Sequence, residues 1–304
     1  MSIAVIGDIF VDIKGYSDGV FIPKGRNPGH IEQVHGGVGR NVAEDLARMG
    51  VESRFVALAD DTGTGEDVIN RLKKSGVDVS CIARVEGGMG TWLAIFDETK
   101  DVAANISIRP DLAPLTQLVA EKEKEIFQES DSIILEIDVE EETVDKVFEL
   151  AEKYNRKVYA LVSVMSIALK RRKYFSKTEC FVCNIQEAGM MFERELEELA
   201  VPELEAFLLE RVKEEGFSKL IVTLGEKGSV YADKSGETGF VGADKVVLVD
   251  STGAGDSFTA GVAAALTEGK TLRQACTVGT KVAANVITRT DNVCEFLHRE
   301  ELGL

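Results

Sequence analysis

Short apolar runs alternate with longer amphipathic stretches along most of the 304-residue chain. Runs with the length and composition of buried strands lie at Ile3–Ile6, Phe55–Leu58, Ser132–Ile137, Val158–Val162, Cys180–Cys183 and Leu220–Leu224. Between them, Val38–Met49 places Val42 and Leu46 on one helical face and is followed by Gly50, a common helix terminator. Ala254–Thr267 is a second predicted helix, rich in small residues that permit close packing. This alternation predicts an α/β domain whose parallel sheet is wrapped by helices.

Two segments depart from this pattern. Residues 12–35 carry several Gly and Pro and show no helical period. Residues 91–108 alternate between apolar and polar and turn at Asp97–Lys100, which predicts a β-hairpin. Two β insertions in an α/β chain could pair into a small lid over a site, and two unrelated surface hairpins are the alternative. We therefore expect one domain over residues 1–304 with lid insertions at 12–35 and 91–108.

Charge and cysteine content narrow the classes of function. A formal net charge of −17 argues against the basic footprint that non-specific nucleic-acid binding needs, although backbone N–H groups can still form a local anion site. No apolar run approaches the ~20 residues that span a bilayer, and no secretory signal pattern is present. Five scattered cysteines suit a reducing compartment, so we expect a soluble, cytoplasmic protein. Cys180 and Cys183 form a lone C-x-x-C in an apolar run, which indicates structural cysteines.

The strongest chemical signal is the segment Val249–Phe258, VDSTGAGDSF. A strand end, a glycine-rich turn and a helix start follow one another there. Glycines let the backbone approach a ligand, and the helix N-terminus adds a positive dipole end, so the turn predicts an anion cradle. Asp256 stands in the first helical turn, where a carboxylate beside a bound phosphate suits removal of a proton from an attacking hydroxyl. An ordinary helix-start carboxylate is the alternative interpretation.

A second glycine turn, Gly36-Gly37-Val38-Gly39-Arg40-Asn41, also leads into a helix. On its own such a turn usually indicates only tight packing. It is not the dinucleotide-binding fingerprint, because the first strand is followed by Gly7-Asp8-Ile9. A dinucleotide-dependent oxidoreductase is disfavoured for that reason.

Taken together, the two glycine segments resemble the signatures of the phosphofructokinase-B-type, or ribokinase, family of carbohydrate kinases, at the usual separation. The resemblance spans essentially the whole chain and implies a ribokinase-like three-layer α/β/α domain with a small β lid. Within the family, Asn27-Pro28-Gly29-His30-Ile31 followed by Gly36–Asn41 is most similar to the bacterial pseudouridine kinases.

The resemblance implies roles for individual residues. The positions that match the family's reacting end are the catalytic base Asp256 and the anion hole Gly253, Ala254 and Gly255. Those that match the substrate pocket are Asp12, Asn27, Gly36, Gly37, Asn41 and Thr91. Those that match the nucleotide site are Thr223, Gly225, Gly228, Thr252 and Asn285. Asn184 and Glu187 match the Asn-x-x-Glu motif that holds Mg²⁺ through water.

The implied activity is ATP-dependent phosphorylation of a ribosyl hydroxymethyl group, with ATP and Mg²⁺ as cofactors and a K⁺ requirement left open. Pseudouridine to pseudouridine 5′-phosphate is the first expectation. A ribokinase-like kinase of a free sugar or another nucleoside is the alternative, and a non-catalytic ligand-binding member is a further one. The family's lid often also forms a dimer interface, so a homodimer stays open.

The chain departs from the family pattern at several places. Ala160–Val164 stands where many members carry Asp-Pro, and Ser107 stands where pseudouridine kinases often carry a carboxylate. Val182-Cys183 precedes Asn184 in place of Lys-Pro, and the tail after Asn285 lacks a clear monovalent-cation loop. Arg109, beside the second insertion, could bind a substrate anion, with a solvated charge as the ordinary interpretation. These departures do not affect the predicted phosphoryl transfer, but they leave the identity of the acceptor undetermined.

Overall fold

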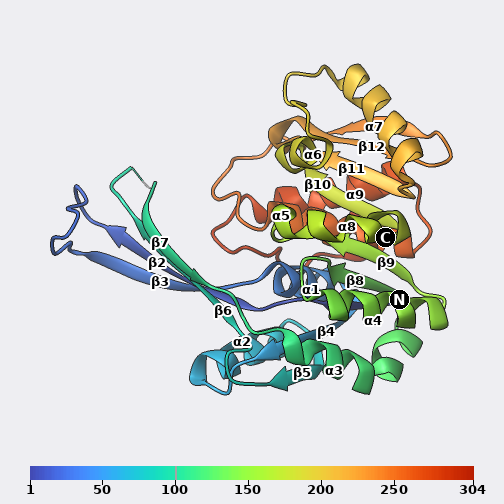
Figure 1. Ribbon diagram of the computed structural model, residues 1–304. Helices are drawn as coiled ribbons and strands as arrows, with labels where there is room; N and C mark the ends of the chain where they lie inside the picture. The colour runs from blue at the N-terminus through green and yellow to red at the C-terminus, as the bar shows by residue number, and fades with distance from the viewer. Residues whose placement is uncertain (100) are drawn as a thin grey trace.

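The computed structural model describes residues 1–99 and 101–304. Within them, nine strands form one sheet in the order β13-β12-β11-β10-β9-β8-β1-β4-β5 (Figure 1). The strands are β1 (Ser2–Ile6), β4 (Glu52–Ala59), β5 (Asp78–Arg84), β8 (Ser132–Glu136), β9 (Lys157–Leu161), β10 (Cys180–Asn184), β11 (Lys219–Thr223), β12 (Gly228–Asp233) and β13 (Thr238–Gly242). Pairing is parallel from β5 to β11, while β12 and β13 are antiparallel. The six strands predicted from apolar runs are therefore confirmed.

Helices cover both faces of this sheet (Figure 1). One face carries α1 (Val38–Arg48), α2 (Gly63–Lys74), α8 (Ala254–Thr267), α9 (Leu272–Val286) and α10 (Arg299–Leu302). The other carries α3 (Ala113–Glu121), η1 (Lys124–Gln128), α4 (Glu141–Lys153), α5 (Met165–Ala168), η2 (Leu169–Lys177), α6 (Ile185–Phe192) and α7 (Val201–Glu215). A short 3₁₀ turn, η3 (Gly225–Lys227), links β11 to β12. The two predicted helices are confirmed as α1 and α8.

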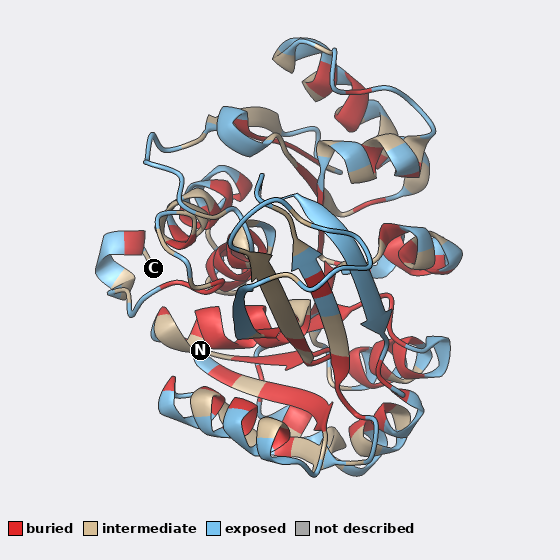
Figure 2. Ribbon diagram, turned by 90° about the vertical axis from the view of Figure 1, so that its left-hand side faces the viewer, coloured by how far each residue is buried: buried red, intermediate tan, exposed pale blue. Residues whose placement is uncertain are grey.

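Burial on both faces explains why the central strands have continuous apolar sequences. In β1, Ile3 and Val5 belong to the core under α1 and α8, while Ala4 and Ile6 belong to the core on the opposite face. A strand with helices on both sides has no polar face to alternate with. Figure 2 shows these inner strands buried and the outer helix faces exposed.

The same alternation separates the two cysteines of the C-x-x-C motif. Cys180 packs in the core with α8 and α9, whereas Cys183 packs in the core on the opposite face. Both thiols are buried, and burial raises the pKa of each well above its ordinary value. Because the sheet lies between them, they cannot act as a redox pair.

A second sheet projects from the body of the protein (Figure 1). Its order is β3-β2-β6-β7, formed by β2 (Phe10–Ser17), β3 (Gly29–Gly36), β6 (Gly90–Phe96) and β7 (Val102–Ile108). The two insertions meet where β2 pairs with β6 in parallel, with Asp12 opposite Trp92. They form one four-stranded sheet rather than two separate hairpins, and its root lies at the carboxyl end of β1.

In the part of the chain that the structure describes, no helix is long and apolar enough to span a membrane.

Candidate active site

The turn before α8 is built around Gly253. Its φ of +82° favours glycine, and a Cβ there would lie 2.1 Å from the carbonyl oxygen of Asn292. Asp250 Oδ1 holds the turn by accepting hydrogen bonds from the backbone N–H and the hydroxyl of Thr252, at 2.9 and 2.8 Å. A Cβ at Gly255 would meet no atom within 4 Å, so the first turn of α8 faces open space. This helix start can receive an anion on its backbone N–H groups.

Asp256 and Asn41 face each other across this opening. Asn41 Nδ2 donates a hydrogen bond of 2.7 Å to Asp256 Oδ2, joining two residues that lie far apart in the chain. Burial raises the pKa of Asp256 from 3.8 to about 7, the Asn41 hydrogen bond opposes this rise, and the nearby Asp45 adds to it. A carboxylate with a pKa near neutrality can take a proton from a hydroxyl at physiological pH.

The orientation of the Asn41 amide is set by the buried Arg40. The Arg40 guanidinium donates to Asn41 Oδ1, to the carbonyl oxygen of His35 and to Glu44, and it reaches Asn292 Oδ1 at 3.0 Å. Because Oδ1 of Asn41 is occupied in this way, its NH₂ group is turned toward Asp256. The contacts of Arg40 thus direct the Asn41 hydrogen bond at the Asp256 carboxylate.

Asp12 lies beside the other glycine turn. A Cβ at Gly36 would come within 3.0 Å of Asp12 Oδ2, and one at Gly37, whose φ is +96°, within 2.7 Å of the Asp8 carbonyl oxygen. Glycine at these positions lets β2 and the start of α1 approach closely. Burial raises the pKa of Asp12, while Lys14 and Arg40 oppose the rise. A half-buried carboxylate in this position can bind neighbouring hydroxyl groups.

These groups open into one cavity of about 390 Å³ between the sheet edge and the second sheet. Its lining residues are Phe10, Asp12, Gly36, Gly37, Val38, Asn41, Trp92, Ser107, Arg109, Ser163, Val164, Thr252, Gly253, Asp256 and Asn292. Seven of the residues predicted for the site therefore meet there: Asp12, Gly36, Gly37, Asn41, Thr252, Gly253 and Asp256. Ala254 and Gly255 adjoin them in the first turn of α8.

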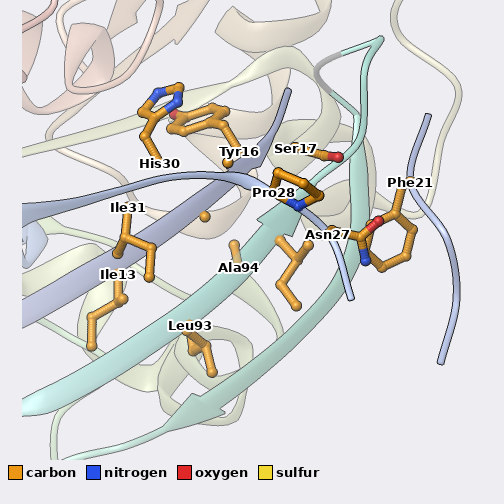
Figure 3. A pocket seen from close by; sticks show the side chains of 13 residues that line it. Ile13, Tyr16, Ser17, Phe21, Asn27, Pro28, His30, Ile31, Leu93 and Ala94 are labelled. Atoms are coloured by element: carbon orange, nitrogen blue, oxygen red, sulfur yellow. The ribbon is translucent and has the colours of Figure 1, made fainter. Parts of the chain in front are cut away.

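Two residues predicted for the substrate pocket lie elsewhere. Thr91 is the strand neighbour of Trp92, and successive side chains of a strand point to opposite faces, so Trp92 faces the cavity and Thr91 faces away. Asn27 lies near the tip of the second sheet, where its side chain is hydrogen-bonded to the backbone N–H and carbonyl of Ile22, at 2.7 and 3.1 Å. It lines a separate cavity (Figure 3). Neither contributes to the cavity around Asp256.

Asn184 and Glu187 form a reciprocal cap at the start of α6. Asn184 Oδ1 accepts from the Glu187 N–H and Glu187 Oε2 accepts from the Asn184 N–H, each at 2.8 Å. Burial raises the pKa of Glu187, and its charge in turn raises the pKa of Asp256. No group of three or more His, Cys, Asp or Glu side chains among the described residues could hold a metal directly. The pair fits a Mg²⁺ ion held through water, which needs few protein oxygens.

The residues predicted for the nucleotide lie outside this cavity, apart from Thr252. Thr223 ends β11, and Gly225 and Gly228 follow it with φ of +58° and +118°. Asn285, in α9, is engaged with Glu295, exchanging side-chain and backbone hydrogen bonds of 3.0 Å. The Asn285 amide is thus occupied within the protein.

Several residues in and behind the cavity escaped the sequence analysis. Trp92 and Asn292 line it, and three buried carboxylates, Asp8, Glu136 and Asp138, lie behind it. Burial and the neighbouring Asp138 raise the pKa of Asp8 to about 7, while Arg109 opposes the rise. Asp8 and Asp138 each come two residues after the end of a strand, β1 and β8 respectively. Carboxylates just after two neighbouring parallel strands were the available signal, because such strand ends meet at one edge of the sheet.

Comparison with known proteins agrees with this geometry. The family model of the pfkB carbohydrate kinases matches residues 1–293. The chain belongs to the pfkB family. It is 34% identical to a guanosine-inosine kinase of Exiguobacterium acetylicum over 95% of both chains, and 24% identical to the pseudouridine kinase of Escherichia coli over 99% of this chain and 94% of that one. The structure of Arabidopsis thaliana ribokinase complexed with ribose and ATP superposes with a TM-score of 0.81 at 17% identity, covering 99% of this chain and 97% of that one.

The predicted family, the ribokinase-like fold and the phosphotransferase class are therefore confirmed. This member of the family is a kinase of nucleosides or sugars that acts on a hydroxyl group.

Proposed function

We propose that the protein transfers the γ-phosphoryl group of MgATP to the 5′-hydroxyl of a purine nucleoside, with guanosine and inosine as the preferred acceptors. The observation that carries the proposal is the Asp256–Asn41 pair beside the open first turn of α8, facing an aromatic wall in the same cavity. The 34% identity to a guanosine-inosine kinase over nearly the full length favours a purine nucleoside over other acceptors.

The proposed chemistry follows from the arrangement. Asp12 and Asn41 bind the ribose hydroxyls and hold the 5′-hydroxyl near Asp256. As the hydroxyl oxygen attacks the γ-phosphorus, Asp256 accepts its proton, and ADP leaves with the electrons of the broken P–O bond. The N–H groups of Gly253, Ala254 and Gly255 receive the charge on the moving phosphoryl oxygens. When bound, Mg²⁺ neutralises phosphate charge, and Asn184 and Glu187 would hold it through water.

Trp92 supports a nucleoside over a free sugar. It lies opposite Asp12 across the β2–β6 ladder, so the ring borders the place where the ribose would bind. Its ring packs edge-on against Phe96, with centroids 6.2 Å apart, which fixes its orientation. A flat indole on the pocket wall can stack on a nucleobase, a contact that a free pentose cannot make.

Pseudouridine is the second candidate acceptor. It is favoured by the Asn27-Pro28-Gly29 run and by the 24% identity to a pseudouridine kinase. The side chain of Asn27, however, is hydrogen-bonded to Ile22 and lines a separate cavity. The polar side chain of this run therefore does not reach the cavity around Asp256. For this reason we rank pseudouridine below the purine nucleosides.

Comparing kcat/KM for guanosine, inosine, adenosine, uridine, pseudouridine and ribose with MgATP tests the proposal. We expect guanosine and inosine to exceed pseudouridine and ribose by at least about tenfold, the discrimination that one well-placed pocket contact provides. A higher kcat/KM for pseudouridine or for ribose would refute the purine assignment, while the assignment to the pfkB family would still hold. Repeating the best reaction in Na⁺ and K⁺ salts tests a monovalent-cation requirement.

We also propose a homodimer formed through the outer face of the second sheet. That face, turned away from the cavity, carries exposed apolar side chains, with Ile31 at 77%, Ile106 at 65% and Ile108 at 63% exposure. It also borders the separate apolar cavity (Figure 3). Exposed patches of this kind mark interaction surfaces. Light scattering should give a dimer mass that Ile106→Lys reduces to a monomer mass, and a monomeric parent protein would refute the interface.

A further inference from the structure

Arg109 lies at the root of the second sheet, immediately after β7, and its side chain borders the active-site cavity. Among the described residues that line this cavity, it is the one cation. Its side chain is 43% exposed and its Nη2 lies 3.7 Å from Asp138 Oδ2. The Arg109 guanidinium forms no hydrogen bond with the residues that the structure describes, so most of its five N–H donors remain available to a ligand.

Asp138 anchors this arginine from behind. The carboxylate follows β8, is buried, and accepts hydrogen bonds of 2.9 Å from the backbone N–H groups of Ser163 and Val164. Those two residues belong to the cavity wall themselves. A carboxylate fixed at two points holds the guanidinium at the wall while leaving its outer edge free to bind a ligand.

Arg109 shares one wall of the cavity with Trp92 and Ser107. Ser107 pairs with Trp92 across the β6–β7 ladder, and Arg109 follows two residues later, on the same side of the strand line. Trp92, Ser107 and Arg109 therefore line one wall of the cavity that Asp12 and Asn41 also line. A nucleoside whose ribose contacts Asp12 and Asn41 would extend its base toward this wall.

We propose that Arg109 is the specificity-determining residue that recognises the O6 and N7 atoms of a 6-oxopurine base. The inference rests on the proposed purine nucleoside function. Guanine and hypoxanthine share two acceptors, O6 and N7, on one edge, and the planar guanidinium presents two parallel donors that match them. Adenine carries an NH₂ donor at position 6, which would face a second donor. Arg109 would therefore favour binding of guanosine and inosine over adenosine. It would not distinguish guanosine from inosine, because the 2-amino group by which they differ lies on another edge of the base.

The test compares Arg109→Met, which removes the donors but keeps the length, with Arg109→Lys, which keeps the charge but removes the fork. In Arg109→Met, kcat/KM for guanosine and inosine should fall by about 10- to 100-fold while adenosine changes little, the range expected for one bidentate base contact. Arg109→Lys should recover only part of this loss. Arg84→Met, which removes an arginine paired with Glu66 outside the cavity, is the matched control and should leave the ratio unchanged.

Removing N7 from the base tests the same contact by changing the substrate in place of the protein. In the parent protein, 7-deazaguanosine, which lacks N7, should be a poorer substrate than guanosine, and this difference should vanish in Arg109→Met, as in a double-mutant cycle. If Arg109→Met folds poorly, Arg109→Lys in the same cycle gives the answer. An equal loss for guanosine, inosine and adenosine, with 7-deazaguanosine still penalised, would assign Arg109 to the phosphoryl group or to the fold and overturn the inference. A parent protein inactive on purine nucleosides would overturn the proposed function itself.

Discussion

Replacing Asp256 by asparagine should make the protein more stable and much less active. Asparagine keeps the shape of the side chain, and its carbonyl oxygen can still accept the hydrogen bond from Asn41 that the carboxylate accepts at 2.7 Å. It cannot accept a proton from the attacking hydroxyl. Loss of a general base typically lowers the rate by about a hundred- to ten-thousand-fold. We expect a fall in kcat of that size with the affinity for ATP largely retained.

The gain in stability follows from the raised pKa. Burial lifts the pKa of Asp256 from 3.8 to about 7, so the folded protein holds a proton that the unfolded chain releases between these values. Stability contributed by the protonated form is therefore lost as the pH rises through that window. This difference in pKa between the folded and unfolded states lowers the free energy of unfolding by at most about 4 kcal/mol near pH 8 and by about 2 kcal/mol near pH 5. The Asp256→Asn substitution would remove both costs, and the larger gain should appear at the higher pH.

Urea unfolding of the nucleotide-free protein at both pH values, together with turnover assays, measures these effects. Asp244→Asn, the same change on the exposed segment 244–249, is the matched control and should affect neither stability nor kcat. In the parent protein kcat/KM should rise with pH through about 7, because the deprotonated Asp256 is the active form. A stability gain that does not grow with pH would contradict the electrostatic argument. Near-normal kcat in Asp256→Asn would refute its role as base.

Three further predictions concern the acceptor pocket and the anion turn. Asp12→Ala should raise the KM of the nucleoside far more than that of ATP, by roughly 1–3 kcal/mol of lost binding, and equal effects on both substrates in steady-state kinetics would make Asp12 structural. Trp92→Leu should weaken nucleoside binding by roughly 1–3 kcal/mol through lost stacking, whereas an unchanged Kd in calorimetry would remove the ring from the base site. Gly253→Ala should lower Tm and kcat together, because the new Cβ would lie 2.1 Å from the Asn292 carbonyl oxygen, and an unaltered thermal melt would contradict this clash.

The elements and the two glycine turns could be predicted from the sequence because their signals are local. Strands such as Ile3–Ile6 are buried on both faces and appear as continuous apolar runs, and α8 begins and ends where its small-residue pattern does. Gly253 was also predictable, since its left-handed φ restricts the residue type at that position. The family resemblance then assigned Asp256 and Asn41 to one site, where the structure joins them by a hydrogen bond.

Only the tertiary structure determined which side chains line the cavity around Asp256. The predicted Thr91 and its strand neighbour Trp92 point to opposite faces of the hairpin, and the sequence shows this alternation without showing which face meets the cavity. That face depends on pairing with β2, a strand far away in the chain. The pairing of Arg109 with Asp138 and the enclosure of Asn27 by Ile22 are likewise side-chain contacts that leave no periodic trace. Local sequence determines backbone conformation through sterics and burial, whereas the walls of a pocket are set by long-range register between strands.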